Sequence, residues 1–454
     1  MPITTAATSP NILDDRQSLV AWFDRTRARS AALFDMIDDA AYYTRPISLR
    51  HPIVFYEGHL PAFAINVLIK KGLGRPGVDA RLETLFARGI DPDSAGDAER
   101  TAEQSRALWP SRAEVKAYVA AADALLRDAL LNERLVRDDV AVLRGGEAVF
   151  TVIEHEAMHQ ETLLYMWHQL PHGMKRKPAG HSPWVSGRAP ARSPARVDEG
   201  RATLGAARGQ IPFGWDNEFG RQDVDVPAFD IDVVNVTNAD WLEFLEGGCY
   251  ATEKLWEPED WAWVRSGAVS HPAFWIPHGN GYLWKGQFED IDLPLAWPVY
   301  VSHAEARAFA RWAGRRLPTE AEYHRAAFGE PGSSGTPRAY PWGEQAPEPA
   351  RGHFDFAAWD PAPAGSHPLG ASAWGVHDLM GNGWEWTSTV FAPFDGFEPM
   401  ASYPEYSADF FDGKHYVLKG ASSVTARELL RPSFRNWFRP HYPYIYAGFR
   451  TVSR

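Results

Sequence analysis

Four segments with helical periodicity, each of roughly 20 residues, fill the first part of the chain and limit what it can fold into. In each segment apolar residues recur three and four positions apart, the spacing that lines one face of an α-helix. The segments cover residues 16–37, 51–73, 111–131 and 146–170. Long helices that follow one another along a chain commonly pack as an antiparallel four-helix bundle. The sequence therefore predicts an N-terminal helical bundle over residues 15–171.

The chain after residue 200 has a different composition. It holds 15 of the 19 tryptophans, among many Gly, Pro and Asn residues. Its short apolar runs are separated by turn signals, and the stretches 307–317 and 318–328 predict helices. We therefore expect a second domain of mixed structure over residues 200–454, with aromatic side chains in its core. The predicted fold class is α+β.

Residues 172–199 are predicted to be a linker between these regions, or a crossing over the surface. The stretch 171–196 contains six Lys or Arg and no Asp or Glu, and it is rich in proline. Such a composition is typical of connecting segments. A length of 454 residues also fits more than one domain.

Composition excludes several classes of protein. The formal net charge of −12 gives no support to a nucleic-acid partner. The single cysteine, Cys249, rules out an internal disulfide framework and a cysteine-cluster metal site, and it fits a reducing cytoplasm. The first residues lack the basic and apolar regions of a secretory signal, and no run approaches ~18 apolar residues. We expect a cytoplasmic protein without a membrane partner.

The fourth helical segment carries the sequence HEAMHQET at residues 155–162. Residues four apart lie on one face of a helix, so His155 and His159 can direct two imidazoles to one point. Two histidines seldom complete a metal site, and His59, in the apolar second segment, is the candidate for a third ligand. Metal sites in bundle cores are built in this way from facing helices.

The same residues also fit H-E-x-x-H, the signature of zinc-dependent proteases. The longer metalloprotease pattern requires Gly and His where this chain has Thr162 and Tyr165. A thermolysin-like site requires a Glu on the next helix, and here prolines and basic residues follow instead. The sequence therefore favours a different use of the histidine pair, with a zinc hydrolase as an alternative.

Together, these features resemble a known family. A bundle with a separated His and a later H-E-x-x-H-x-E-T precedes the motifs NVTNADWLEFL, RWAGRRLPTEAEY, LMGNGWEWT and AGFR. This combination resembles the sulfoxide synthases of ergothioneine and ovothiol biosynthesis, to which the selenoneine synthases are related. The resemblance spans roughly residues 15–454. It implies a DinB-like bundle followed by a C-type-lectin-like domain of the formylglycine-generating-enzyme type. Formylglycine-generating activity is not expected, because it requires a pair of cysteines.

The resemblance also implies a site. In this family three histidines hold iron(II), and His59, His155 and His159 match them by position, so Fe(2+) is the expected cofactor. Three neutral imidazoles leave positions for a thiolate or selenolate, the imidazole substrate and O2, unlike the commoner site of two His and one carboxylate. The stretch FRNWFRP, residues 434–440, matches the substrate pocket. Asn436 and Trp437 would contact the betaine group of hercynine, whose trimethylammonium favours aromatic faces through cation–π attraction.

Two departures from the family pattern bear on the sulfur or selenium donor. Enzymes that use γ-glutamylcysteine place an acidic residue after the Asn-Trp pair, where this chain has Phe438. Ergothioneine enzymes tend to have Gln where this chain has Met158, and this position, with RHPIVFYEGH, is more similar to the ovothiol enzymes. Those enzymes typically carry a fused methyltransferase, which has no counterpart up to Arg454. We therefore expect a selenoneine synthase with a selenosugar donor; the alternative is an ergothioneine-type sulfoxide synthase using cysteine or γ-glutamylcysteine.

The family also uses a tyrosine near the iron as a proton donor or redox gate. Tyr403 and Tyr406 are the candidates, and a plain surface or core role for either stays open. Two readings of another class also stay open: a zinc hydrolase, including the thiol-linked DinB-like type, and a non-catalytic binding module. The identity of the metal distinguishes a zinc hydrolase from the oxygenase. Oxygen consumption that depends on hercynine distinguishes the oxygenase from a binding module.

Overall fold

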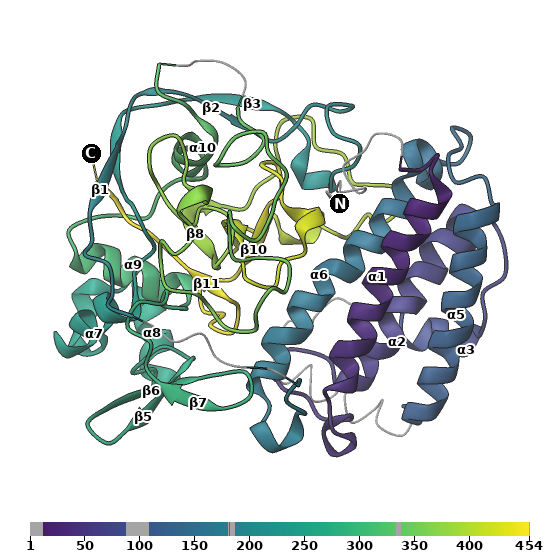
Figure 1. Cartoon of the computed structure of the whole chain (residues 1–454), viewed down its shortest axis with the longest axis horizontal. Coiled ribbons are helices and arrows are strands. Elements are labelled where there is room, and N and C mark those ends of the chain that lie inside the picture. Colours follow the sequence, from purple (N-terminus) through teal and green to yellow (C-terminus); the bar gives the residue numbers. More distant parts are fainter. Residues whose placement is uncertain (1–11, 88–108, 180, 182–186, 333–336, 454) are drawn as a thin grey trace. The chain divides into compact units, whose positions relative to one another are not determined.

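Residues 12–87, 109–179, 181, 187–332 and 337–453 are described in the computed structural model of the chain. The chain divides into two units (Figure 1). The helical unit comprises Met1–Gly180 together with Met400–Pro404, and the mixed unit comprises His181–Pro399 and Glu405–Arg454. The limits predicted for the domains and the linker, at residues 171 and 199, stay predictions.

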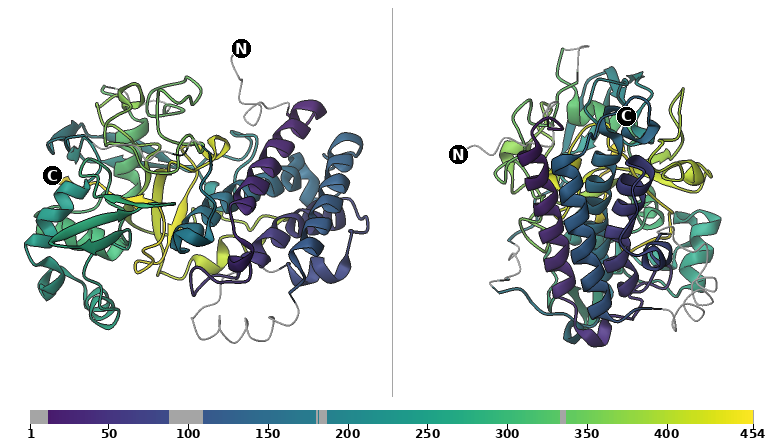
Figure 2. Two further views of the ribbon diagram at one scale, coloured as in Figure 1. Left: turned by 60° about the horizontal axis from the view of Figure 1, so that its bottom comes forward. Right: turned by 90° about the vertical axis from the view of Figure 1, so that its right-hand side faces the viewer.

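Four long helices form a bundle in the helical unit, as the sequence predicts. They are Arg16–Asp35 (α1), Ile53–Ala64 (α2), Arg112–Asn132 (α5) and Glu147–Gln169 (α6). Helix α1 packs against α5 and α6, and α2 packs against the same two helices. The right-hand view of Figure 2 shows long helices of this unit running side by side. The shorter helices are Asp39–Ala41 (η2), Ala80–Leu85 (α3), Ala141–Gly146 (η4) and His172–Met174 (η5).

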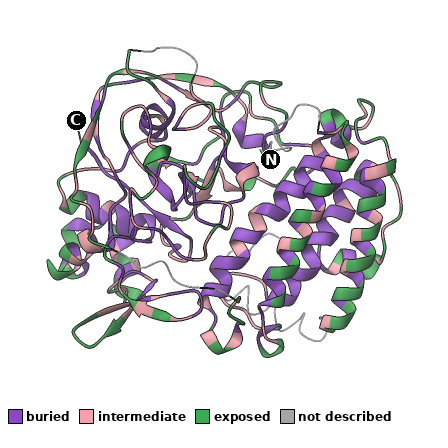
Figure 3. Cartoon of the chain, in the orientation of Figure 1, coloured by how far each residue is buried: buried purple, intermediate pink, exposed green. Residues whose placement is uncertain are grey.

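Burial differs sharply between the helices of the bundle. All 12 residues of α2 are buried, as expected for a helix that is apolar on every side. Exposed positions recur along α1 and α5, so these helices present one face to solvent (Figure 3). Side-chain caps mark where those two helices begin: Asp15 accepts a hydrogen bond from the backbone N–H of Ser18, and Ser111 accepts one from Glu114.

A proline alters the hydrogen bonding of α2. Pro61 lies inside the helix and has no N–H, so the α-helical bond to the carbonyl of Glu57 cannot form. The chain continues from Ile65 to Gly72 with π-helical bonding (η3). Stretches of π-helix are frequent at functional sites. The change in bonding begins just after the turn that carries His59.

The mixed unit contains four sheets among its described residues. Their strands are Pro194–Val197 (β1), Gly200–Leu204 (β2), Gln222–Val226 (β3), Phe229–Asp232 (β4), Trp275–His278 (β5), Gly281–Lys285 (β6), Asp290–Asp292 (β7), Gly383–Val390 (β8), Tyr416–Ala421 (β9), Asn436–Phe438 (β10), Ala447–Gly448 (β11) and Val452–Ser453 (β12). The largest sheet has the order β10-β9-β8-β11, where β11 is parallel to β8 and the other pairs are antiparallel. A second sheet has the order β1-β4-β12, a third pairs β2 with β3, and a fourth has the order β5-β6-β7.

The helices of the mixed unit include the two that the sequence predicts. They are Asn238–Glu246 (α7), Pro258–Ser266 (α8), His303–Trp312 (α9) and Glu320–Phe328 (α10). Helix α10 lies within the predicted stretch 318–328, but the prediction of 307–317 for α9 was wrong at both ends. The helix starts earlier because Ser302 and Glu305 form a capping box. It ends before Gly314, whose φ of +65° is left-handed.

Aromatic residues fill the core of the mixed unit, which confirms that expectation. Six of its tryptophans are fully buried: Trp215, Trp241, Trp275, Trp284, Trp297 and Trp386. A helical bundle and a sheet-containing unit in one chain also confirm the α+β class. Within the described ranges, no helix is both long enough and apolar enough to cross a membrane.

Candidate metal centre and substrate-binding residues

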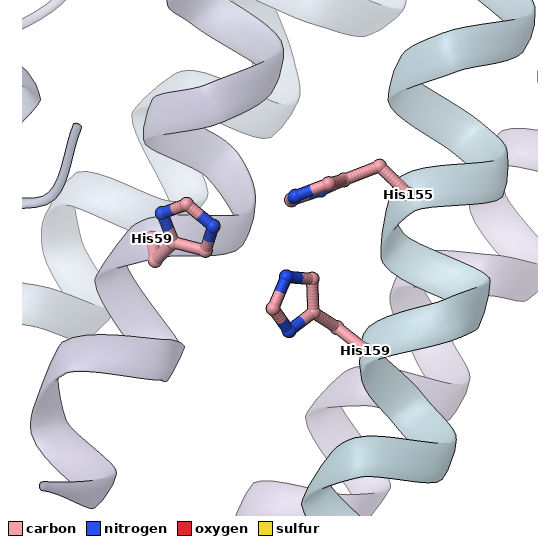
Figure 4. Close-up of side chains that lie close together, drawn as sticks. All are labelled: His59, His155 and His159. Carbon is pink, nitrogen blue, oxygen red and sulfur yellow. The ribbon is translucent and has the colours of Figure 1, made fainter. Parts of the chain in front are cut away.

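Three histidines predicted as metal ligands come together in the helical unit. His59 lies on α2, and His155 and His159 lie one turn apart on α6 (Figure 4). One ring nitrogen from each lies within 4.8 Å of those of the other two. The spacing of four residues on α6 directs both rings toward α2, as the sequence predicts. Among the described residues, no other set of three His, Cys, Asp or Glu side chains converges in this way.

The hydrogen bonding of His59 leaves one nitrogen free for a metal. Its Nδ1 lies 2.8 Å from the backbone carbonyl oxygen of Phe86. A carbonyl can only accept, so Nδ1 carries the proton and Nε2 of the neutral ring carries a lone pair. Nε2 is buried and has no hydrogen-bond partner. Metal-binding histidines are commonly oriented by such a bond from the non-coordinating nitrogen.

Burial keeps all three imidazoles uncharged. It lowers the pKa of His59 to about 4, although the bond to Phe86 acts in the opposite direction. Burial and then the neighbouring imidazoles place the pKa of His155 well below its ordinary value. The pKa of His159 is lowered in the same way, with a further contribution from the positive charge of Arg50. Uncharged imidazoles are the form that binds divalent iron, zinc, copper or nickel, so this group fits a transition metal.

Aromatic rings from α2 surround the histidines. Phe55 stacks on His59 with ring centroids 5.0 Å apart, and Phe63 stacks on His155 at 3.7 Å. The ring of Tyr56 lies 5.9 Å from that of His159. These side chains reduce contact with water around the cluster, and they restrict the orientation of each imidazole.

Glu156, the acidic residue of the H-E-x-x-H pattern, points away from the cluster. Its carboxylate accepts hydrogen bonds from Arg27 at 2.8 Å and from Ser30 at 2.5 Å, both on α1. In a zinc protease this glutamate is the general base beside the metal. Here it is bound in a buried ion pair on the opposite side of α6. The arrangement disfavours the protease reading.

The two candidate tyrosines have different surroundings. Tyr403 belongs to the helical unit, where its ring lies 5.1 Å from that of Phe63 and 6.1 Å from that of His155. Tyr406 belongs to the mixed unit and packs against Trp215 and Trp437, at 4.1 and 5.2 Å. The structure thus brings Tyr403, and not Tyr406, beside a residue of the histidine cluster within one unit.

The predicted substrate-binding residues form strand β10 of the mixed unit. The side-chain oxygen of Asn436 accepts a hydrogen bond from the backbone N–H of Trp437 at 2.9 Å, which leaves its NH2 group available. Phe391 stacks on Trp437 at 4.2 Å and covers one face of the indole. A cation that binds the indole must therefore approach a side of the ring that Phe391 does not cover. Phe438 stacks on Tyr442 at 5.2 Å and brings no charge to its position.

The sequence analysis did not identify several residues that lie around the histidine cluster. The carbonyl of Phe86 has no sequence signature, because any residue could supply it. The sequence of α6 did carry a signal for two of them, because Glu147 and Thr151 continue the four-residue spacing that relates His155 to His159. Both bind Ser402, the neighbour of Tyr403.

Comparisons with known proteins agree with the two units. Residues 23–163 match the DinB superfamily, and residues 186–454 match the sulfatase-modifying factor enzyme 1-like domain. The chain is 37% identical over 440 residues to hercynine oxygenase of Mycolicibacterium thermoresistibile, covering 94% of this chain and 92% of that protein. It is 35% identical to hercynine oxygenase of Mycobacterium tuberculosis, over 96% of this chain and 98% of that one. It is also 28% identical to ergothioneine biosynthesis protein 1 of Neurospora crassa, over 100% of this chain and 59% of that protein.

Proposed function

This chain belongs to the family of ergothioneine and ovothiol sulfoxide synthases, and we propose that it forms a carbon–selenium or carbon–sulfur bond on the imidazole ring of hercynine, using O2. Support comes from relatives named hercynine oxygenase that match it over nearly its whole length. The observation that carries the proposal is the convergence of His59, His155 and His159 inside the helical bundle, where the first two are buried and the third is half-buried. Members of this family are enzymes, so a purely non-catalytic binding module is disfavoured.

The cofactor in this proposal is iron(II), held by the three histidines. Imidazole donors alone fit several metals, and the choice of iron rests on the family. Bound iron(II) would supply the binding and activation of O2 and the coordination of a sulfur or selenium atom. The chain's own part is to hold three uncharged imidazoles in a set orientation. The bond to Phe86 and the ring of Phe55 orient His59, and the stacked ring of Phe63 orients His155.

Three further residues have proposed roles toward the substrates. Trp437 would bind the trimethylammonium group of hercynine through cation–π attraction, and the free NH2 of Asn436 would donate a hydrogen bond to its carboxylate. Tyr403 would exchange a proton with the reacting substrates through its phenol oxygen. Its ring contacts with Phe63 and His155 support this choice over Tyr406.

The proposed donor is a selenosugar. Phe438 offers no charge to a γ-glutamyl group, and its ring is stacked on Tyr442. A neutral, hydroxyl-rich donor suits this position better than one with a charged amino group and carboxylate. A thiol donor, cysteine or γ-glutamylcysteine, is the second candidate, and it would make the chain an ergothioneine-type sulfoxide synthase. The cytoplasmic location stays a prediction.

An oxygen-uptake experiment tests the core of the proposal. Protein purified without oxygen is loaded with iron(II) and supplied with hercynine and each donor in turn, and the products are identified by mass spectrometry. We expect oxygen consumption that requires hercynine and a hercynine product that contains selenium or sulfur. Hydrolysis by the zinc-loaded protein, with no oxygen uptake, would instead establish the zinc hydrolase.

A further inference from the structure

A five-residue segment from the C-terminal part of the sequence is built into the helical unit. Met400–Pro404 belongs to this unit, whereas the residues on both sides of it belong to the mixed unit. The segment is held at two consecutive residues. Lys71, in η3, donates a hydrogen bond from Nζ to the carbonyl oxygen of Ala401 at 2.8 Å. Ser402, which is buried, makes the remaining bonds to α6.

Ser402 is fully engaged by α6. Its backbone N–H and its hydroxyl both donate to Oε1 of Glu147, each at 2.7 Å. Because the Ser402 hydroxyl donates to this carboxylate, Thr151 is the donor in the 2.9 Å bond between the two hydroxyl groups. The carboxylate of Glu147 and the hydroxyl of Thr151 therefore fix the backbone and the side chain of Ser402 together. Bonds that involve a charged acceptor are the stronger class of hydrogen bond.

The residues that hold Ser402 continue the face of α6 that carries the histidines. Glu147, Thr151, His155 and His159 follow one another at intervals of four, so they form one row along the helix. The contacts follow this row: Ser402 binds at Glu147 and Thr151, and the next residue, Tyr403, reaches the level of His155. The Tyr403 side chain is half-buried, and its ring contacts those of Phe63 and His155.

We propose that Glu147 and Ser402 are positioning residues, which set the phenol of Tyr403 at the metal centre. This inference rests on the proposed function for its consequence in catalysis, but not for its geometry. A tyrosine on an irregular segment has many accessible orientations, and fixing the backbone of the residue before it reduces their number. The polar bonds one residue away remove the backbone freedom that would otherwise let the ring leave the cluster.

A distance measurement tests the geometry without turnover. The full chain carries 3-fluorotyrosine at position 403 and is loaded with cobalt(II), a paramagnetic ion, or with zinc as the diamagnetic reference. Cobalt broadens the fluorine resonance steeply as the distance to the ion falls. We expect strong broadening in the parent protein and a several-fold loss of it in Ser402→Ala and Glu147→Gln, at unchanged cobalt content. The conservative Ser402→Thr should restore the broadening. Glu405→Gln, which makes the same chemical change at an exposed residue outside the cluster, should match the parent.

A second readout separates positioning from a merely structural role. With hercynine and donor, Ser402→Ala should consume several-fold more O2 per product formed than the parent, while its affinity for metal is unchanged. Broadening that is the same in the parent, Ser402→Ala and Glu147→Gln would overturn the inference. An unchanged ratio of O2 to product would overturn its consequence for catalysis. If the parent shows no hercynine-dependent oxygen uptake, the proposed function fails, and the fluorine signal still decides whether these residues position Tyr403.

Discussion

His59 donates a hydrogen bond from Nδ1 to the backbone carbonyl of Phe86 over 2.8 Å, and the ring of Phe86 packs directly against the glycine that precedes the histidine. A Cβ atom on Gly58 would lie 2.2 Å from the ring of Phe86. No side chain fits in that space unless Phe86 moves. The absence of a side chain at residue 58 therefore leaves room for Phe86 beside the imidazole of His59, the proposed metal ligand.

The first prediction follows from this contact. Gly58→Ala should displace Phe86, weaken the bond to His59 and reduce metal affinity by about 10–100-fold, the usual effect of losing a partner that orients a ligand. Competition with a chelator of known affinity measures the change. Gly173→Ala is the matched control, because a Cβ there meets nothing within 4 Å. Equal affinities in the parent and Gly58→Ala would show that the orientation of His59 does not depend on Phe86.

The second prediction concerns the three ligands. Replacing His59, His155 or His159 with Ala should abolish stoichiometric metal binding and turnover, because two imidazoles are an incomplete site. The bundle should stay folded, as circular dichroism would show. Elemental analysis by mass spectrometry, on protein purified without oxygen, should find about one iron per chain in the parent. Stoichiometric zinc together with full activity would contradict the assignment of iron.

The third prediction separates the oxygenase from a zinc protease. Glu156→Ala should lower the free energy of unfolding by about 3 kcal/mol, the low end for breaking a buried ion pair, because Asp123 still pairs with Arg27 at 2.8 Å. Metal content and hercynine-dependent oxygen uptake should persist under conditions where the variant is folded. Denaturant titration and an oxygen electrode give the two quantities. Loss of turnover in a stably folded Glu156→Gln would instead assign this carboxylate to the chemistry.

The sequence predicted those parts of the site that follow from local periodicity. Spacing along α6 placed His155 and His159 on one face, and a lone histidine in an apolar segment supplied His59. Contacts that arise only from the tertiary structure were not predictable. Tyr403 and Tyr406 are three residues apart and look equivalent in the sequence, yet they belong to different units. The segment that carries Tyr403 is bound to the helical unit through Ser402 and Ala401, and a serine or alanine in an irregular segment has no sequence pattern that predicts such a contact.

The fourth prediction concerns recognition of hercynine. Trp437→Ala should weaken its binding by about 0.5–2 kcal/mol, the range of a cation–π contact. Trp437→Phe should retain part of the affinity, because it keeps an aromatic face. Calorimetry with hercynine and with histidine makes the comparison, since histidine lacks the trimethylammonium group. If the parent binds the two ligands equally, the pocket does not recognise that group.

The last prediction concerns the donor. A γ-glutamyl donor brings an amino group and a carboxylate that need partners once they lose water. Phe438 provides neither a charge nor a hydrogen bond, and its ring lies against Tyr442 with an interplanar angle of 10°. We therefore expect kcat/KM to fall in the order selenosugar, cysteine, γ-glutamylcysteine when the donors compete at equal concentration.

Phe438→Asp, which restores the acidic residue of related enzymes, should raise kcat/KM for γ-glutamylcysteine by about 10–100-fold, the value of one hydrogen bond to a charged group. It should leave the value for cysteine closer to that of the parent, because cysteine lacks the γ-glutamyl group. If the parent enzyme prefers γ-glutamylcysteine, Phe438 does not determine which donor is used, and the chain belongs with the ergothioneine synthases.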